Sequence, residues 1–176
     1  MSCTFAGNAM ATDVSDNWYN INTLVEGCLF SYAPVTNTTG DVVLDCGADG
    51  VFNSTPYAMA LTASSIQNLN TNALDQTMST GNNASTTPSS GATSTTAGAH
   101  EMLMGGVFTS GPLSDADGTW SNSFNNGQKD GTADATAAHN IKVSEGYLAV
   151  SATGAYTAAK TGITSRVWVA LIGTYR

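Results

Sequence analysis

The C-terminal segment from Ile163 to Arg176 (ITSRVWVALIGTYR) constrains the fold more than any other part of the chain. In a strand, its apolar side chains fall on both faces: Val167, Val169 and Leu171 on one, Trp168, Ala170 and Ile172 on the other. Such a strand lies in the middle of a sheet and is covered on each side. We therefore expect a layered β protein in which this segment is central, and we expect its truncation to unfold the domain.

The rest of the chain also favours β structure. Segments rich in β-branched and aromatic residues are short and are separated by clusters of Gly, Asn, Pro and Asp. The expected strands are Thr23 to Pro34, Gly40 to Gly47, Pro56 to Ile66, Glu101 to Thr109 and Ile141 to Thr153. A length of 176 residues suits one domain with a substantial core. The fold class is therefore all-β, a single antiparallel β-sandwich over 1–176, of jelly-roll type.

Pairing and local detail follow from the turns. The turn-like stretch 36–40 predicts a hairpin between the first two strands, and Ile141 to Thr153 is expected to pair with the C-terminal strand. In Pro56 to Ile66, the bulky Tyr57, Met59 and Leu61 are expected to face a core. The Gly105-Gly106 pair predicts a bulge or bend.

Two regions leave alternatives open. Residues 69–80 suit either a short helical turn or a loop. The Ser/Thr-rich stretch Thr80 to Gly98 suits either a disordered loop or an ordered, solvent-facing edge strand. In the turn-rich stretch from Gly111 to Thr136, Trp120 and Phe124 are expected to reach back into the core or to cover a sheet edge.

Charge is scarce, which narrows the function classes. Only 10% of residues are Asp, Glu, Lys or Arg, against about 25% in ordinary soluble domains. The net charge of −8 repels phosphate backbones and anionic lipids, so nucleic acid and membrane are poor partner candidates. No apolar run is long enough for a membrane span, and the N-terminal residues lack the features of a signal peptide. Nucleophile-elbow and phosphate-loop motifs are absent, so we expect neither an enzyme nor a cofactor.

Metal and carboxylate sites are further alternatives. Cys3, Cys28 and Cys46 are expected to be buried thiols, with a Cys28–Cys46 disulfide as the alternative. Aspartates near Gly118 and Gly131 suit ordinary turns better than calcium loops. A hydrolytic carboxylate pair could involve Glu26 and Glu101, which both lie in expected strands.

Three stretches carry a resemblance to a known family: TFAGNAMATD near the start, SSGATSTTAGAHEMLMGGVF in the middle and VSATGAYTAAKTGITSRVWVALIGTYR at the end. Together they resemble a Ser/Thr/Gly-rich β-sandwich family of tailed-phage virion proteins and bacterial surface proteins without an assigned activity. Members of that family have one or two strands before the first stretch. The resemblance therefore implies a sandwich that is completed by a neighbouring subunit's strand.

The resemblance implies a virion structural protein, a tailed-phage capsid decoration protein made in the host cytoplasm. Its partners would be copies of itself and a major capsid or other virion protein, with contacts expected at Phe5, Met10, Trp18 and Tyr19 and in the 80–98 region. One alternative is a glycan- or receptor-binding module of a phage fibre or an extracellular bacterial surface protein. In that case Trp120, Tyr147 and Tyr156 would stack on sugars. Another alternative is a self-assembling extracellular filament subunit.

Overall fold

The computed structural model describes residues 1–20, 23–33, 39–45, 58–70 and 72–176. They form an all-β protein, as the sequence predicts. The strands are β1 (Ser2–Phe5), β2 (Asn8–Ala9), β3 (Ala11–Asn20), β4 (Thr23–Ser31), β5 (Val42–Asp45), β6 (Leu74–Ser85), β7 (Glu101–Thr109), β8 (Asp117–Trp120), β9 (Asn125–Gly131), β10 (Lys142–Val150), β11 (Lys160–Ile163) and β12 (Arg166–Tyr175). A 3-10 turn covers Ala137–His139. Among these residues no helix has the length and apolar character needed to cross a membrane.

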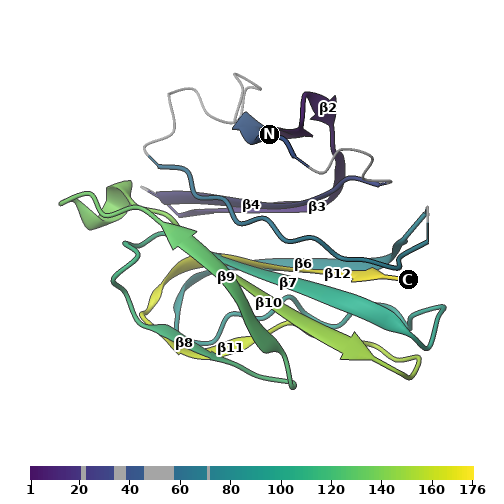
Figure 1. Ribbon diagram of the computed structural model, residues 1–176. Coiled ribbons are helices and arrows are strands. Elements are labelled where there is room, and N and C mark those ends of the chain that lie inside the picture. The colour runs from purple at the N-terminus through teal and green to yellow at the C-terminus, as the bar shows by residue number, and fades with distance from the viewer. Residues whose placement is uncertain (21–22, 34–38, 46–57, 71) are drawn as a thin grey trace.

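The main sheet has five antiparallel strands in the order β6-β12-β7-β10-β9 (Figure 1). β12 pairs with β6 on one edge and with β7 on the other, and nearly all of its side chains are buried. The prediction of a central, two-sided C-terminal strand is confirmed.

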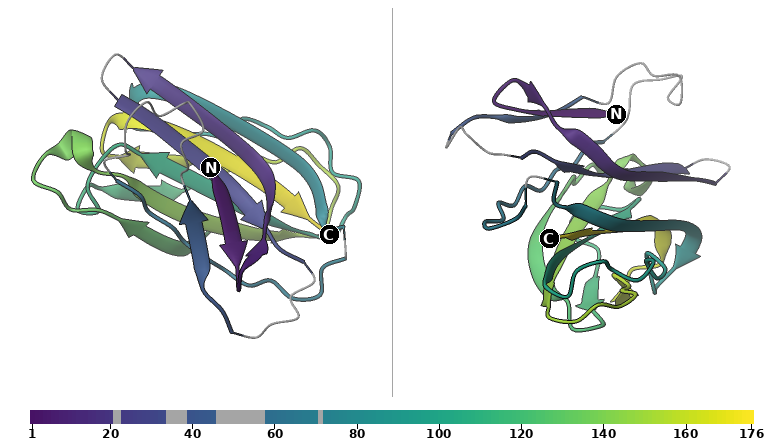
Figure 2. Two further views of the ribbon diagram at one scale, coloured as in Figure 1. Left: turned by 90° about the horizontal axis from the view of Figure 1, so that it is seen from above. Right: turned by 90° about the vertical axis from the view of Figure 1, so that its right-hand side faces the viewer.

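Each face of this sheet packs against a different cover. On one face, Val167, Val169 and Leu171 form a core with Val25 and its neighbours on the β3–β4 hairpin. On the other face, Trp168, Ala170 and Ile172 join a second core, which is closed by β8, β11 and the segments beside them. The end-on view in Figure 2 shows these layers one above the other.

Glycine allows the close approach of both covers. Gly105 and Gly146 pair across β7 and β10, and the ring of Trp120 packs against them. A Cβ on Gly146 would lie 2.5 Å from Trp120. On the hairpin, a Cβ on Gly27 would lie 2.5 Å from the ring of Phe108, so the hairpin lies close against β7. Because the β7 register continues through its two glycines, the predicted bulge does not occur there.

A third layer lies outside the hairpin. β1 pairs with β2 and β5 in a small antiparallel sheet that contains the N-terminus, seen at the top of Figure 1. Cys3 pairs with Leu44 and Phe5 with Val42. This sheet covers the face of β4 that points away from the main sheet.

Several sequence predictions need correction. The expected hairpin between Thr23 to Pro34 and Gly40 to Gly47 is wrong, because β4 pairs with β3 and β5 with β1. The expected strand at Pro56 to Ile66 is absent over the described residues 58–66, and Met59 is 52% exposed instead of facing a core; Tyr57 lies outside the described residues. β10 and β12 do not pair with each other because β7 lies between them.

The polar stretch Thr80 to Gly98 is ordered. Its first part belongs to edge strand β6. The remainder runs beside residues 154–162, where the backbone amides of Ser90, Thr93 and Thr96 donate hydrogen bonds to the carbonyls of Ala158, Tyr156 and Gly154. Because these bonds and the burial of its hydroxyl side chains hold it in place, the low-complexity composition does not produce disorder here.

Candidate functional site

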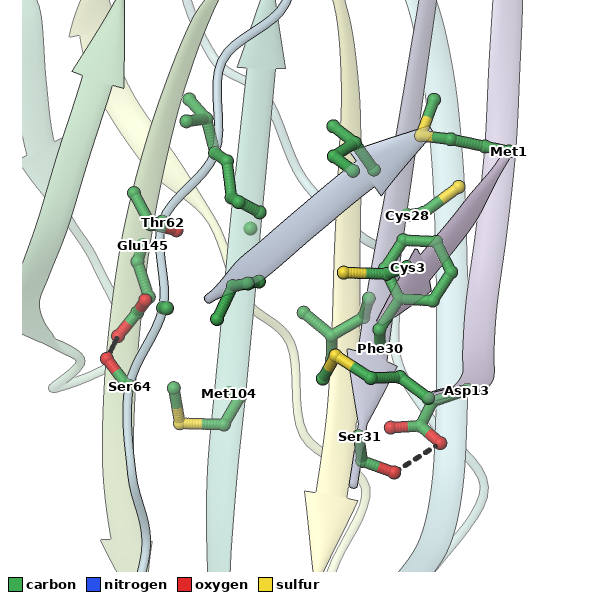
Figure 3. A pocket seen from close by; sticks show the side chains of 18 of the residues that line it. Met1, Cys3, Asp13, Cys28, Phe30, Ser31, Thr62, Ser64, Met104 and Glu145 are labelled. Carbon is green, nitrogen blue, oxygen red and sulfur yellow. Dashed lines mark hydrogen bonds between the residues drawn. The ribbon is translucent and has the colours of Figure 1, made fainter. Parts of the chain in front are cut away.

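A cavity of about 1690 Å³ lies between the small N-terminal sheet and the rest of the molecule (Figure 3). Its roof is formed by β1 and β5, and one wall is β4. The opposite wall is the extended segment 58–70, and β7 and β10 contribute Met104 and Glu145. Figure 3 shows Thr62 and Ser64 on one side of this space and Cys28 and Phe30 on the other.

Strand alternation directs the side chains into this cavity. In β4, Val25 and Gly27 are buried toward the main sheet, whereas Leu24, Glu26, Cys28 and Phe30 line the cavity. In the roof, Cys3, Phe5, Val42 and Leu44 line it, whereas Val43 on the opposite face is 53% exposed. The interior is mostly apolar, and in the roof strands it is formed by side chains at every second position.

Two hydrogen-bonded carboxylates lie at its edges. Glu145 on β10 is buried and accepts a hydrogen bond from the Ser64 hydroxyl at 2.6 Å. Asp13 on β3 accepts hydrogen bonds from Ser31 at 2.9 Å and from the Tyr175 hydroxyl at 2.7 Å. Burial raises the pKa of Asp13, although both hydroxyls favour its charged form. Burial also raises the pKa of Tyr175.

The charge of the lining is one-sided. Its carboxylates are Asp13, Glu26 and Glu145, and its described residues include His139 but no Lys or Arg. This arrangement favours a neutral or cationic occupant over an anionic one.

The predicted contact residues fall mainly at this cavity. Phe5, Met10 and Tyr19 line it, and Tyr19 is 67% exposed. Phe5 also contacts Tyr32, with ring centroids 5.9 Å apart. Trp18 instead packs against the hairpin core and donates a hydrogen bond to Asn83 on β6 at 3.0 Å.

The three predicted sugar-stacking aromatics have different environments. Trp120 is 7% exposed and lies in the core, where it stacks on Phe124 at 5.7 Å. Tyr156 packs against the same core and donates a hydrogen bond to the carbonyl of Ala152. Tyr147 on β10 is exposed. The ring of Trp120 is therefore not available to stack on a sugar, because it is packed against other side chains of the protein.

A second polar group lies below the main sheet. Asp117 is 3.0 Å from the Lys160 ammonium and 3.2 Å from the Lys142 ammonium, and it accepts a 2.6 Å hydrogen bond from Ser144. The Lys160 ammonium also lies 5.1 Å from the centre of a Trp120 ring. Burial opposes the charge of Asp117, but the hydroxyl and the two lysines outweigh it and lower its pKa to about 2. Burial lowers the pKa of Lys160. Because the space at this cluster is only about 10 Å³, the group stabilises the fold and has no room for a substrate.

The remaining candidates give no second site. Cys3 is a buried free thiol, and the sulfur of Cys28 lies 3.9 Å from a Glu26 oxygen. Cys46 lies outside the described residues, so the disulfide alternative is untested. Glu101 accepts a hydrogen bond from the Gly98 amide and is not part of the cavity that contains Glu26. Within the described ranges, no three His, Cys, Asp or Glu side chains are arranged to hold a metal ion.

Glu145, Ser64 and the cavity wall that contains Ser64 were not among the site residues predicted from the sequence. The sequence does contain a signal for Glu145. It lies two residues after the apolar Val143, so in a strand both side chains point to the same face. Comparison with known proteins found no matching family model, curated protein or solved structure.

Proposed function

We propose that this protein is a non-enzymatic structural protein of a virus particle, a decoration protein that stabilises a tailed-phage shell through protein–protein contacts. One observation carries the proposal: an apolar cavity lies beside β4, and β4 pairs with a single strand, β3, in the described part of the chain. A sheet edge of this kind next to an apolar cavity suits the docking of another protein chain.

The main sheet is suited to a mechanical role. Its interior strand β12 is covered on both faces and is buried along nearly its whole length. Close-packed cores of this kind are stiff and transmit load without rearranging. A rigid sandwich with a docking edge therefore supports a shell without needing chemistry. Self-association of copies on the shell remains part of the proposal.

The glycan-binding alternative has less support. It depended on a platform of exposed aromatic rings, and Trp120 is inside the core. Tyr147 and Tyr19 are exposed, but they lie in different sheets, Tyr147 on β10 and Tyr19 on β3, and so do not share one platform. A single exposed ring gives little affinity for a sugar.

Particle composition tests the proposal. Virus particles from the source that encodes this chain are purified, the copies of the protein per particle are counted by quantitative mass spectrometry, and the particles are imaged by electron cryomicroscopy. We expect hundreds of copies on the shell surface. A handful of copies at a fibre tip supports the receptor-binding alternative, and absence from particles contradicts the proposal.

A further inference from the structure

We infer that the cavity beside β4 binds an extended, apolar segment that carries a basic residue and belongs to a different protein, and that this segment adds to β4 as a strand. The inference rests on the proposed function and names the partner of the same site. It follows from the size of the cavity, the pairing of β4, the pattern of the walls and the sign of their charge.

The size favours a polypeptide. Pockets for small molecules and cofactors measure roughly 300–1,000 Å³. The cavity here, at about 1690 Å³, is well above that range. It also extends along β4, whose nine residues span about 30 Å at the usual rise per residue. An occupant that runs along β4 fits this space better than a compact one.

The strand pairing favours an extended backbone. β3 and β4 form a two-stranded sheet over a five-stranded one, and the rest of that face is covered by segment 58–70, which is not a strand over its described residues. A peptide main chain beside β4 would form a regular ladder of hydrogen bonds, which neither a lipid nor a sugar can form. It would also extend the smaller sheet.

The walls favour apolar side chains at alternate positions. Leu24 and Phe30 come from β4, Val42 and Leu44 from the roof and Met104 from the main sheet. A strand in this space would direct every second side chain toward the roof and the others toward the main sheet. Both sets would meet apolar groups.

The charge favours a basic residue in that segment. The carboxylates of Asp13, Glu26 and Glu145 line the cavity, and no described Lys or Arg side chain does. Glu145 is only 9% exposed, and its one described side-chain partner is neutral, the Ser64 hydroxyl. A Lys or Arg on the incoming segment would pair with a carboxylate that is already shielded from water.

The positions of the basic residues in this chain favour a different protein as the partner. The first 128 residues contain no Lys or Arg. Of the five basic residues, Lys142, Lys160 and Arg166 are held by aspartates in the fold, and Arg176 follows directly after the buried strand β12. Lys129 lies in the polar sequence NNGQKDG of β9, which has no alternating apolar residues. These 176 residues therefore contain no free basic, apolar strand that a second copy could donate.

A random library of displayed twelve-residue peptides tests the inference directly. The purified full chain is used as bait, and enriched peptides are then synthesised and their affinities measured by fluorescence anisotropy. We expect enrichment of peptides that alternate apolar and polar positions and contain Lys or Arg. Proline substituted in the middle of such a peptide should abolish binding, because it removes a ladder hydrogen bond.

Matched variants locate the site. Leu44→Trp puts bulk into the cavity, whereas Val43→Trp puts the same bulk on the solvent face of the same strand. We expect the first to weaken binding about tenfold or more and the second to change it less than about twofold. Glu145→Gln should reduce the preference for basic peptides about fivefold, whereas Asp41→Asn, an exposed acid outside the lining, should not.

Three results would overturn the inference: no enrichment from the library, enrichment of acidic peptides, or equal binding by the Leu44→Trp and Val43→Trp variants when both are folded by circular dichroism. Each would leave the proposed function standing if particles still contain many copies of the protein. Conversely, basic peptides could bind at β4 while the protein is absent from virus particles. That result would support the binding site and contradict the proposed function.

Discussion

The main sheet and the N-terminal layers bury their apolar side chains to different extents. In β12 the residues from Val167 to Ile172 are buried on both faces. In the N-terminal half, Val43 and Met59 are more than half exposed, and the inward side chains of β1, β5 and β4 enclose a large cavity. Tight packing makes the first region a rigid platform, whereas incomplete packing leaves the second region able to accept further apolar surface.

The two regions also differ in how they hold charge. Asp117, below the main sheet, is paired with two lysines, and its pKa is lowered to about 2. It stabilises the fold above its unfolded pKa, and that contribution is lost as the pH falls. Burial raises the pKa of Asp13 on the hairpin, so protonated Asp13 favours the folded protein at low pH. That contribution to stability is lost as the pH rises. The N-terminal region has no basic side chain to hold its carboxylates.

The largest expected difference comes from one chemical change made in both regions. Leu171→Ala removes a fully buried side chain from β12 and should lower the free energy of unfolding by about 4 kcal/mol. Leu44→Ala, in the roof, should cost about 1 kcal/mol, because that side chain already faces a cavity. Urea denaturation followed by tryptophan fluorescence measures both. Similar losses would mean that the two regions are packed equally well.

The second difference concerns the ion cluster. Asp117→Asn leaves the two buried lysines without a countercharge and should cost about 3 kcal/mol. The double variant Asp117→Asn, Lys160→Met should regain a large part of that loss, because one uncompensated charge is removed. The same denaturation measurement applies. If the double variant is less stable than Asp117→Asn alone, the cluster does not act through charge.

Low pH should reduce the stability that Asp117 gives to the main-sheet region. As the pH falls from about 4 to about 2, protonation of Asp117 should remove about 1–2 kcal/mol of stability, a value reduced for its partial exposure. The free energy of unfolding, measured at a series of pH values, should decline in wild type and decline less in Asp117→Asn. Parallel pH profiles for the two proteins would assign the acid sensitivity to other carboxylates.

The smallest effect tests a connection between the regions. The Tyr175 hydroxyl at the end of β12 donates a hydrogen bond to Asp13 on β3. Tyr175→Phe should cost about 1 kcal/mol and should speed amide exchange in the hairpin more than in β7. Hydrogen exchange read by mass spectrometry makes this comparison. Faster exchange in β7 than in the hairpin would contradict the assigned role of this bond.

The sequence predicted the parts of the fold whose pattern is strong and local. β12, β7 and β10 each combine β-branched residues with clear boundaries, and all three occur where expected. Strand pairing was harder, because the turn-like stretch 36–40 suggested a hairpin, whereas the partners of β4 and β5 are β3 and β1. β3 is rich in Asp and Asn, and its strand conformation depends on packing against the main sheet.

The candidate site could be predicted only in part. Phe5, Met10 and Tyr19 were named from the sequence as contact residues, and all three line the cavity. The opposite wall was not foreseen, since the pattern of Pro56 to Ile66 predicted a core strand. Whether an alternating segment joins a sheet or lies beside it depends on the neighbours that tertiary structure supplies.

Hydrogen exchange of the free protein tests the central claim most directly: a rigid main sheet carries loosely packed N-terminal layers. Amide protection is measured by mass spectrometry under native conditions. We predict the slowest exchange in β7 and β12, at the level of global unfolding, and exchange at least about a hundredfold faster in β1, β4 and β5. Equal protection across these strands would contradict the account, because the N-terminal layers would then belong to one uniformly packed unit.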